Sequence, residues 1–258
     1  MKNAIIFIIM NIFFLLFVFP LYADTIIIAS DNWCPISCEP NSDQEGFMVD
    51  IAKIVFKKEG HKVEYKNIPW NRTLEMARKG IINGVIGVYI EDCPDFIFPK
   101  NELAMIGFNI FVQKGNSWTY NGISSLEEIN LAIIADYSYG NEVDSYIKKN
   151  KNKSSRLQIM YGDAPFKQNI MKLLMGRVDA LIETDAVFWY TANKLKVTNQ
   201  LKTAGVVTKP KESYIAFSPA LPTSKVYAEI LSNEIIKLRK SGELEKILIK
   251  YGLTDWKK

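Results

Sequence analysis

Two stretches of the chain share one pattern of hydrophobic and polar positions. Residues 74–87 read LEMARKGIINGVIG and residues 172–183 read KLLMGRVDALIE, and they align with Gly80 on Gly176. Each is a helix-like segment that ends at a glycine and is followed by a short apolar run. A helix that leads into a strand covered on both faces is the second half of a βαβ unit. Two such units predict two similar α/β lobes, and a cleft between lobes is a usual place for a small ligand.

Strands and helices alternate over the rest of the chain. The clearest amphipathic helix covers residues 47–59, with Met48, Ile51 and Val55 on one face and Gly60 after its end. We predict strands at residues 25–30, 62–66, 84–88, 107–112, 131–135, 157–161, 178–182, 201–207 and 214–217. We predict further helices from Pro69 onward and at residues 141–149, 164–175, 185–195, 225–240 and 243–251.

This order predicts an α/β fold in which one lobe is inserted into the other. Lobe 1 is expected at residues 24–112 and 213–258, and lobe 2 at residues 113–212. An insertion makes two linking segments, which we expect near residues 112–116 and 207–213. Two parallel links can act as a hinge.

The N-terminus has the pattern of a signal peptide. Lys2 precedes an apolar run over residues 4–19, and the small residue Ala23 precedes Asp24. We therefore predict that residues 1–23 are removed on export and that the mature chain lies in the periplasm. The alternative is an uncleaved membrane anchor, since the run falls a little short of the roughly 20 residues that span a bilayer.

Composition and cysteine spacing narrow the function classes. The net charge of +4 is spread along the chain, so we expect no nucleic-acid partner. Cys34 and Cys38 lie four apart around a proline, which favours a disulfide between them. The alternatives are a bridge from Cys93 to one of the pair, or no bridge. A metal site is not expected, because His61 is the only histidine and no C-x-x-C pair occurs.

Candidate ligand-binding residues follow from position. Loops at the carboxyl ends of strands in open α/β sheets face the crevice where ligands bind. The residues predicted there are Asn32, Trp33, Trp70, Arg72, Tyr89, Tyr137, Tyr139, Glu183, Thr184 and Asp185. Several have a structural alternative: Trp70 can cover the core, Arg72 can be solvated, and Asp185 can cap a helix. Of Tyr137 and Tyr139, we expect one to face the cleft and one the core.

The order of these segments resembles the periplasmic solute-binding proteins of polar amino-acid ABC transporters, bacterial extracellular family 3. The resemblance rests on GFMVDIA at residues 46–52, GRVDA at 176–180 and SGELEKILIKYG at 241–252, and it covers essentially the whole mature chain. It implies a type II periplasmic binding fold with a central ligand cleft and a two-strand hinge. It also implies a monomer that captures a small polar solute for an ABC transporter permease, without a cofactor and without catalysis.

The resemblance does not extend to the residues that bind the ligand. In amino-acid binders of this family an Arg holds the ligand's carboxylate in a bidentate fork, and alignment on Phe98 puts Asp92 at that position. The family's amine-binding Asp corresponds to Thr184. Two other functions stay open: a ligand-sensing module for a membrane partner, or a lyase or dehydratase with Glu183, Asp185 or Asp136 as acid or base.

Overall fold

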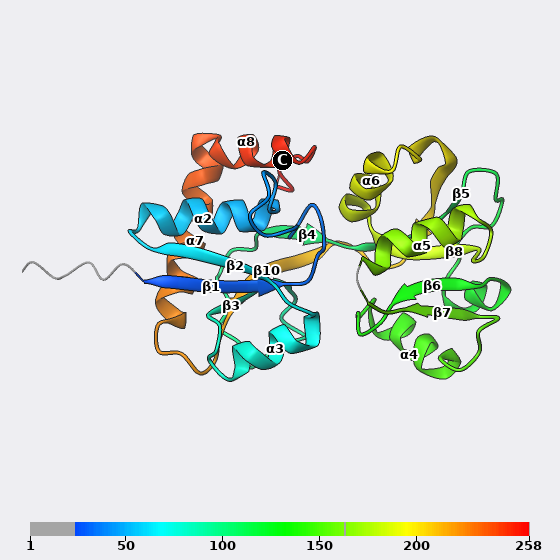
Figure 1. Cartoon of the computed structure of the whole chain (residues 1–258), viewed down its shortest axis with the longest axis horizontal. Coiled ribbons are helices and arrows are strands. Elements are labelled where there is room, and N and C mark those ends of the chain that lie inside the picture. The colour runs from blue at the N-terminus through cyan, green and yellow to red at the C-terminus, as the bar shows by residue number, and fades with distance from the viewer. Residues whose placement is uncertain (1–23, 163, 258) are drawn as a thin grey trace, which may run out of the picture.

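The computed structural model describes residues 24–162 and 164–257, which form two α/β lobes side by side (Figure 1). This confirms the predicted fold class. The predicted signal peptide, residues 1–23, lies outside the described residues. Within the described ranges, no helix has the length and apolar character needed to cross a bilayer.

The first lobe is a five-stranded sheet in the order β2-β1-β3-β10-β4. Strands β1, β2 and β3 are parallel, and β10 is antiparallel to both β3 and β4. Helices α2, α7 and α8 cover one face, and α3 covers the other (Figure 1). The bounds are β1 Thr25–Ser30, α2 Phe47–Lys58, β2 Lys62–Asn67, α3 Trp70–Arg78, β3 Gly84–Val88, β4 Ala104–Ile106, β10 Lys211–Phe217, α7 Ser224–Ser241 and α8 Glu243–Lys250.

The second lobe repeats this plan, with the strand order β7-β6-β8-β5-β9. Here β6, β7 and β8 are parallel, and β5 is antiparallel to β8 and β9. Helices α5 and α6 lie on one face and α4 on the other (Figure 1). The bounds are β5 Phe108–Gln113, η1 Ile123–Glu128, β6 Leu131–Ile134, α4 Asn141–Asn150, β7 Leu157–Met160, α5 Pro165–Leu174, β8 Ala180–Thr184, α6 Asp185–Lys194, η2 Thr198–Gln200 and β9 Leu201–Val206.

The pattern of helix, glycine and strand that occurs twice in the sequence marks equivalent units of the two lobes. Each copy supplies the helix and strand that stand at the same place, α3 with β3 and α5 with β8. Gly80 and Gly176 follow these helices with φ of +69° and +66°. A left-handed residue ends a helix at little cost only when it has no Cβ, which explains why both copies have glycine there.

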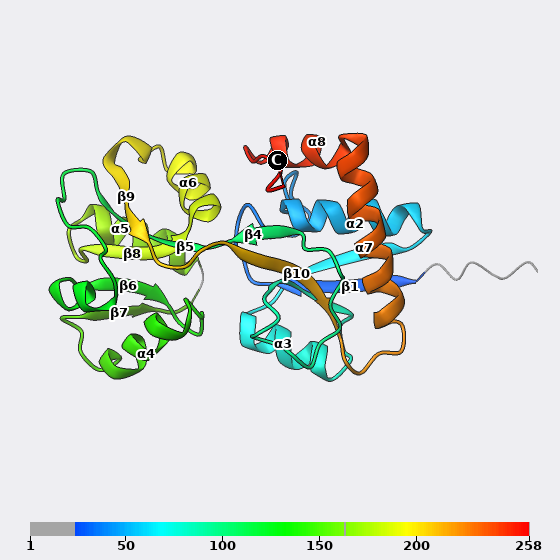
Figure 2. The same cartoon turned by 180° about the vertical axis from the view of Figure 1, so that it is seen from behind.

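The chain passes between the lobes at a place that the sequence did not reveal. The first link was predicted near residues 112–116, but β5 pairs in the second sheet, so the chain crosses at Gly107. The short strand β4 was not predicted. Because β4 and β5 follow one another with only Gly107 between them, the apolar pattern shows no break. The return link lies between β9 and β10, and Figure 2 shows the two links side by side.

The disulfide prediction is confirmed. Cys34 and Cys38 are bonded, with their Cα atoms 4.7 Å apart. Cys93 is a free, buried thiol. The bond closes the short loop that follows β1, so it holds the segment that carries Trp33.

Gly107 is predicted to be essential for the contact between the two links. A Cβ at this position would lie 2.6 Å from the carbonyl oxygen of Thr208. Gly107→Ala should therefore lower the free energy of unfolding by about 1–3 kcal/mol, the usual range for overpacking. Urea denaturation of wild type and variant measures this difference.

Gly115→Ala is the matched control, because a Cβ there would have no atom within 4 Å. It should change stability by about 0.5 kcal/mol or less. Equal losses in the two variants would show that the links do not touch as described.

Candidate functional site

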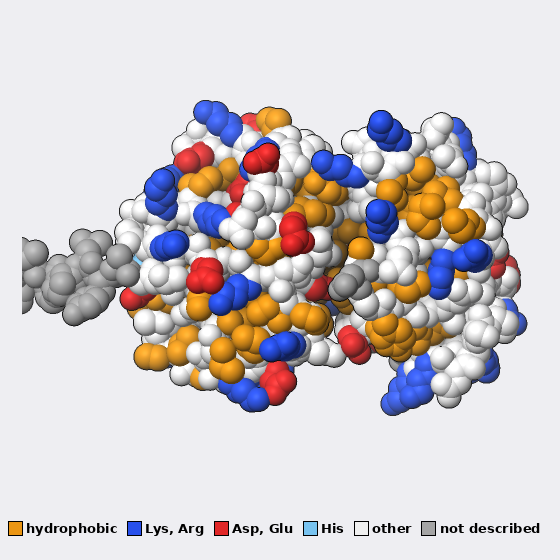
Figure 3. All heavy atoms as spheres, viewed as in Figure 1, with side chains coloured by type: hydrophobic (Ala, Val, Ile, Leu, Met, Phe, Trp, Pro, Cys, Tyr) orange, Lys and Arg blue, Asp and Glu red, His pale blue; other side chains and the backbone are white. Residues whose placement is uncertain are grey.

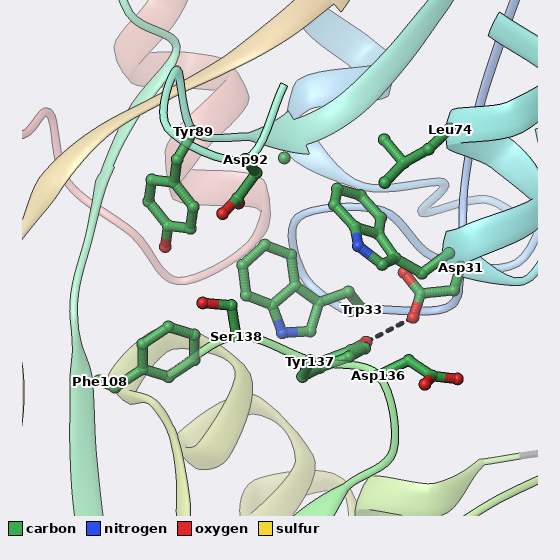
Figure 4. Close-up of a pocket in the computed structure, with 11 residues that line it drawn as sticks. Asp31, Trp33, Leu74, Tyr89, Asp92, Phe108, Asp136, Tyr137 and Ser138 are labelled. Atoms are coloured by element: carbon green, nitrogen blue, oxygen red, sulfur yellow. Dashed lines mark hydrogen bonds between the residues drawn. The ribbon is translucent and has the colours of Figure 1, made fainter. Parts of the chain in front are cut away.

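The candidate site is a cavity between the lobes, beside the ends of β1, β3 and β6. It has a volume of about 180 Å³ and adjoins a wider cleft of about 890 Å³ that shares Asp31, Trp33, Trp70, Asp136 and Tyr137 with it. Figure 3 shows the junction of the two lobes, where the molecule is hollowed. The cavity is lined by Asp31, Trp33, Trp70, Leu74, Gly87, Tyr89 and Asp92 of the first lobe and Phe108, Asp136, Tyr137 and Ser138 of the second (Figure 4).

Two hydrogen bonds join the lobes behind this cavity. The indole Nε1 of Trp33 donates to Oε1 of Glu183 across 3.1 Å. The hydroxyl of Tyr137 donates to Oδ2 of Asp31 across 2.5 Å (Figure 4). The rings of Trp33 and Tyr137 meet edge to face, with centroids 6.5 Å apart. The walls of the cavity therefore come from both lobes and contact one another directly.

Glu183 is a buried acid at this junction. It is 0% exposed, and its Oε1 also accepts the backbone N–H of Thr184 at 2.7 Å. Its Oε2 has no hydrogen-bond partner among the described residues. Burial raises the pKa of Glu183 to about 8, and the charge of Asp31 adds to the shift. Burial also raises the pKa of Asp31, although the hydrogen bond from Tyr137 opposes this.

Four predicted residues line the cavity itself: Trp33, Trp70, Tyr89 and Tyr137. Asn32 lines the adjoining cleft. The hydroxyl of Tyr89 is buried and lacks a hydrogen-bond partner among the described side and main chains. The structure thus brings these five residues to the cavity and its adjoining cleft. This is the arrangement expected if loops at the carboxyl ends of strands face the ligand, which we call the strand-end rule.

The other predicted residues lie elsewhere. Tyr139 is fully buried in the core of the second lobe, where its hydroxyl accepts the N–H of Ile134, and Tyr137 faces the cavity. Thr184 caps α6 by accepting the N–H of Val187 at 3.4 Å. Asp185, the first residue of α6, lines a separate groove. Arg72 is exposed on α3 and does not line the cavity.

The arrangement agrees with comparisons to known proteins. The sequence pattern of the bacterial extracellular solute-binding proteins, family 3, matches residues 26–254. The chain belongs to this family. A relative named probable histidine-binding protein, from Neisseria gonorrhoeae, is 25% identical over 222 residues, which are 83% of this chain and 77% of the relative. This chain is accordingly a solute-binding protein, and its predicted family is confirmed.

Solved structures show the same fold. An ancestral arginine-binding protein bound to arginine has a TM-score of 0.68 at 21% identity, over 88% of this chain and 97% of that one. A glutathione-import protein of Streptococcus mutans has a TM-score of 0.73 at 19% identity, over 90% and 96%. A histidine kinase sensor domain has a TM-score of 0.70 at 16% identity, over 90% and 98%.

Sequence reasoning on this solute-binding protein missed several lining residues. Asp31 follows β1 directly, so the strand-end rule could have included it beside Asn32. Phe108 begins β5 and was not considered, because the crossing was placed too late in the chain. Asp92, which the sequence analysis singled out by its alignment on Phe98, lines the cavity. Among the described residues, no group of His, Cys, Asp and Glu is arranged to hold a metal ion.

Glu183 is predicted to make this solute-binding protein less stable as the pH rises. Its folded pKa of about 8 exceeds its ordinary value of 4.5. Between these values the folded chain keeps a proton that the unfolded chain has lost, so stability falls with rising pH and levels off above the folded pKa. Glu183→Gln cannot ionise. Its midpoint of thermal unfolding should therefore fall less than that of wild type between about pH 5 and pH 9.

Glu64→Gln provides the control, because it removes an exposed carboxylate on the edge strand β2. It should keep the pH dependence of wild type. If Glu183→Gln and wild type show parallel pH profiles, Glu183 does not hold the proton assigned to it.

Proposed function

We propose that this protein captures a small polar solute between its two lobes and delivers it to the permease of an ABC importer. The proposal includes export by the signal peptide at residues 1–23 and action as a monomer in the periplasm. Residues 24–106 and 211–257 then form one lobe and residues 108–162 and 164–206 the other, with the links between them as the hinge.

One observation carries this proposal. The cavity takes its lining from both lobes, and the lobes are joined behind it by the hydrogen bonds of Trp33 with Glu183 and of Tyr137 with Asp31. A solute in such a cavity touches both lobes at once, so its binding favours the conformation in which the lobes meet. A permease that recognises that conformation can then distinguish the loaded protein from the empty one.

The related proteins support a small polar ligand. The Neisseria relative is named for histidine, and similar folds bind arginine or take part in glutathione import. The cavity of about 180 Å³ and the adjoining cleft of about 890 Å³ give room for a small solute. Its aromatic walls and few carboxylates provide the mostly apolar lining with convergent polar groups that small-molecule sites have.

A thermal-shift screen tests capture of a solute. The mature chain, refolded to remove carried-over ligand, is heated with millimolar amino acids, amines, small carboxylates, nucleosides or sugars. A ligand present at about a thousand times its dissociation constant adds about 4 kcal/mol to stability. We expect a rise of several degrees that is confined to one chemical class.

Two variants place the binding site. Trp70 lines both the cavity and the wider cleft, whereas Arg72, two residues later on α3, lines neither. Trp70→Ala should abolish or strongly reduce the ligand-induced shift, and Arg72→Ala should keep it. A shift lost in Arg72→Ala but kept in Trp70→Ala would put the ligand outside this cavity. If no compound in the screen raises the unfolding midpoint of the folded wild type, capture of a solute is contradicted.

A further inference from the structure

The charges that line the inner cavity all have one sign. Asp31, Asp92 and Asp136 contribute carboxylates, and no Lys, Arg or His is among the described residues that line it. Asp92 points into the space beside the Tyr89 and Trp33 rings (Figure 4). Asp136 lines both the cavity and the wider cleft, so it lies where the two meet. An anionic group in this cavity would face carboxylates with no cation to balance them.

Three lysines lie around the cavity without lining it. Burial raises the pKa of Asp92, and the charge of Lys211 offsets this rise only in part. Lys211 lies 3.0 Å from Glu91, to which it donates a hydrogen bond, and it does not line the cavity. Lys167 and Lys194 line only the wider cleft, and the Nζ of Lys194 sits over the Tyr190 ring, 5.4 Å from its centre.

The remaining lining is strongly aromatic. Trp33, Trp70, Tyr89, Phe108 and Tyr137 supply rings from both lobes. The face of an aromatic ring carries negative charge, so a cation inside a group of rings is stabilised. The Tyr89 hydroxyl is buried and has no partner among the described residues, which leaves it free to donate or to accept a hydrogen bond with a ligand. The rings and the carboxylates thus both favour a ligand that is positively charged and donates hydrogen bonds.

We propose that the inner cavity binds a small organic cation that carries no carboxylate, such as an alkylamine or an alkylguanidine. This rests on the proposed function of solute capture and names the class of solute. The cation sits among the rings of Trp33, Trp70 and Tyr137, and the carboxylates of Asp31 and Asp92 balance its charge. An amino acid with the same side chain binds more weakly, because its carboxylate enters a cavity that has only acids.

Matched pairs of ligands test the proposal directly. Isothermal titration of the mature wild-type chain compares agmatine with arginine, putrescine with ornithine and histamine with histidine, where each pair differs only by the carboxylate. We expect the decarboxylated member to bind at least about tenfold more tightly, the effect of one unfavourable charge contact. Choline, a cation without N–H groups, separates the two sources of affinity. If choline binds about as tightly as agmatine, the affinity for the cation comes from the aromatic rings. If choline binds much more weakly, the affinity comes from hydrogen bonds to the carboxylates.

The outcomes separate this proposal from the proposed function. If arginine, ornithine or histidine binds as tightly as its partner or more tightly, the proposed class of carboxylate-free cations is overturned and solute capture stands. Binding confined to neutral or anionic solutes has the same meaning. If no solute of any class binds to the folded protein, both the cation class and solute capture are overturned.

Substitutions at Asp92 test the assignment to this cavity. Asp92 is exposed and precedes the β4 strand in a loop, so replacing it leaves the core intact. Asp92→Asn should weaken the binding of agmatine by about three- to fivefold, the range for a partly solvated charge pair. Asp92→Arg should reverse the order within a pair, so that arginine binds better than agmatine. Glu64→Gln, which also removes one negative charge but lies on β2, should change neither affinity. An unchanged order of affinities in Asp92→Arg, with the amine still binding, would show that the ligand does not reach this side chain and would overturn the site.

Discussion

The hydrogen bond between the Trp33 indole and Glu183 is the interaction on which the cleft depends. It joins the loop after β1 in one lobe to β8 of the other, and it fixes the ring that forms one wall of the cavity. Tyr137 meets the edge of that ring and is itself bound to Asp31. Without these contacts the two lobes would offer two half-sites on separate surfaces. The cavity therefore exists as one site only while the lobes meet.

The contact between the lobes also contains a feature that destabilises it. Glu183 is wholly buried, its Oε2 has no partner among the described residues, and the nearby charge of Asp31 disfavours its ionisation. A buried polar atom without a partner costs free energy that the hydrogen bonds around it offset only in part. The contact between the lobes is therefore weaker than its number of bonds suggests. A weak contact suits a binding protein, because a ligand can shift a conformational equilibrium only by its difference in affinity for the two states.

The fold could be predicted from the sequence to a large extent because its strongest signals are local. The helix-glycine-strand echo at Gly80 and Gly176 identified the equivalent units of the two lobes. The first crossing could not be found in this way, since β4 and β5 form an almost continuous apolar run and no turn residue other than Gly107 marks the change of sheet. Which sheet a strand joins is decided by contacts distant in sequence, and a single sequence shows the strand but not its partner.

The site was predictable at the level of loops but not of single side chains. The strand-end rule placed Trp33, Trp70, Tyr89 and Tyr137 at the cleft, and these four residues line the cavity. It could not separate Glu183, Thr184 and Asp185, which are adjacent yet serve the lobe junction, a helix cap and a different groove. Neighbouring residues of a strand point to opposite faces, so an error of one residue exchanges core and surface. The predicted strand at residues 178–182 ended two residues before β8 does, which is enough to obscure the role of Glu183.

Some residues that form the site are needed for the fold, and others are not. Trp33 and Glu183 are buried and hold the lobes together, so their replacement affects stability as well as binding. Asp92 and Asp136 are exposed, lie in loops and still line the cavity. Loop side chains on a rigid scaffold can change without loss of the core. Two of the three carboxylates of the cavity therefore belong to residues that the fold does not require, and only Asp31 also takes part in the contact between the lobes. Such a division allows one architecture to serve ligands of different charge.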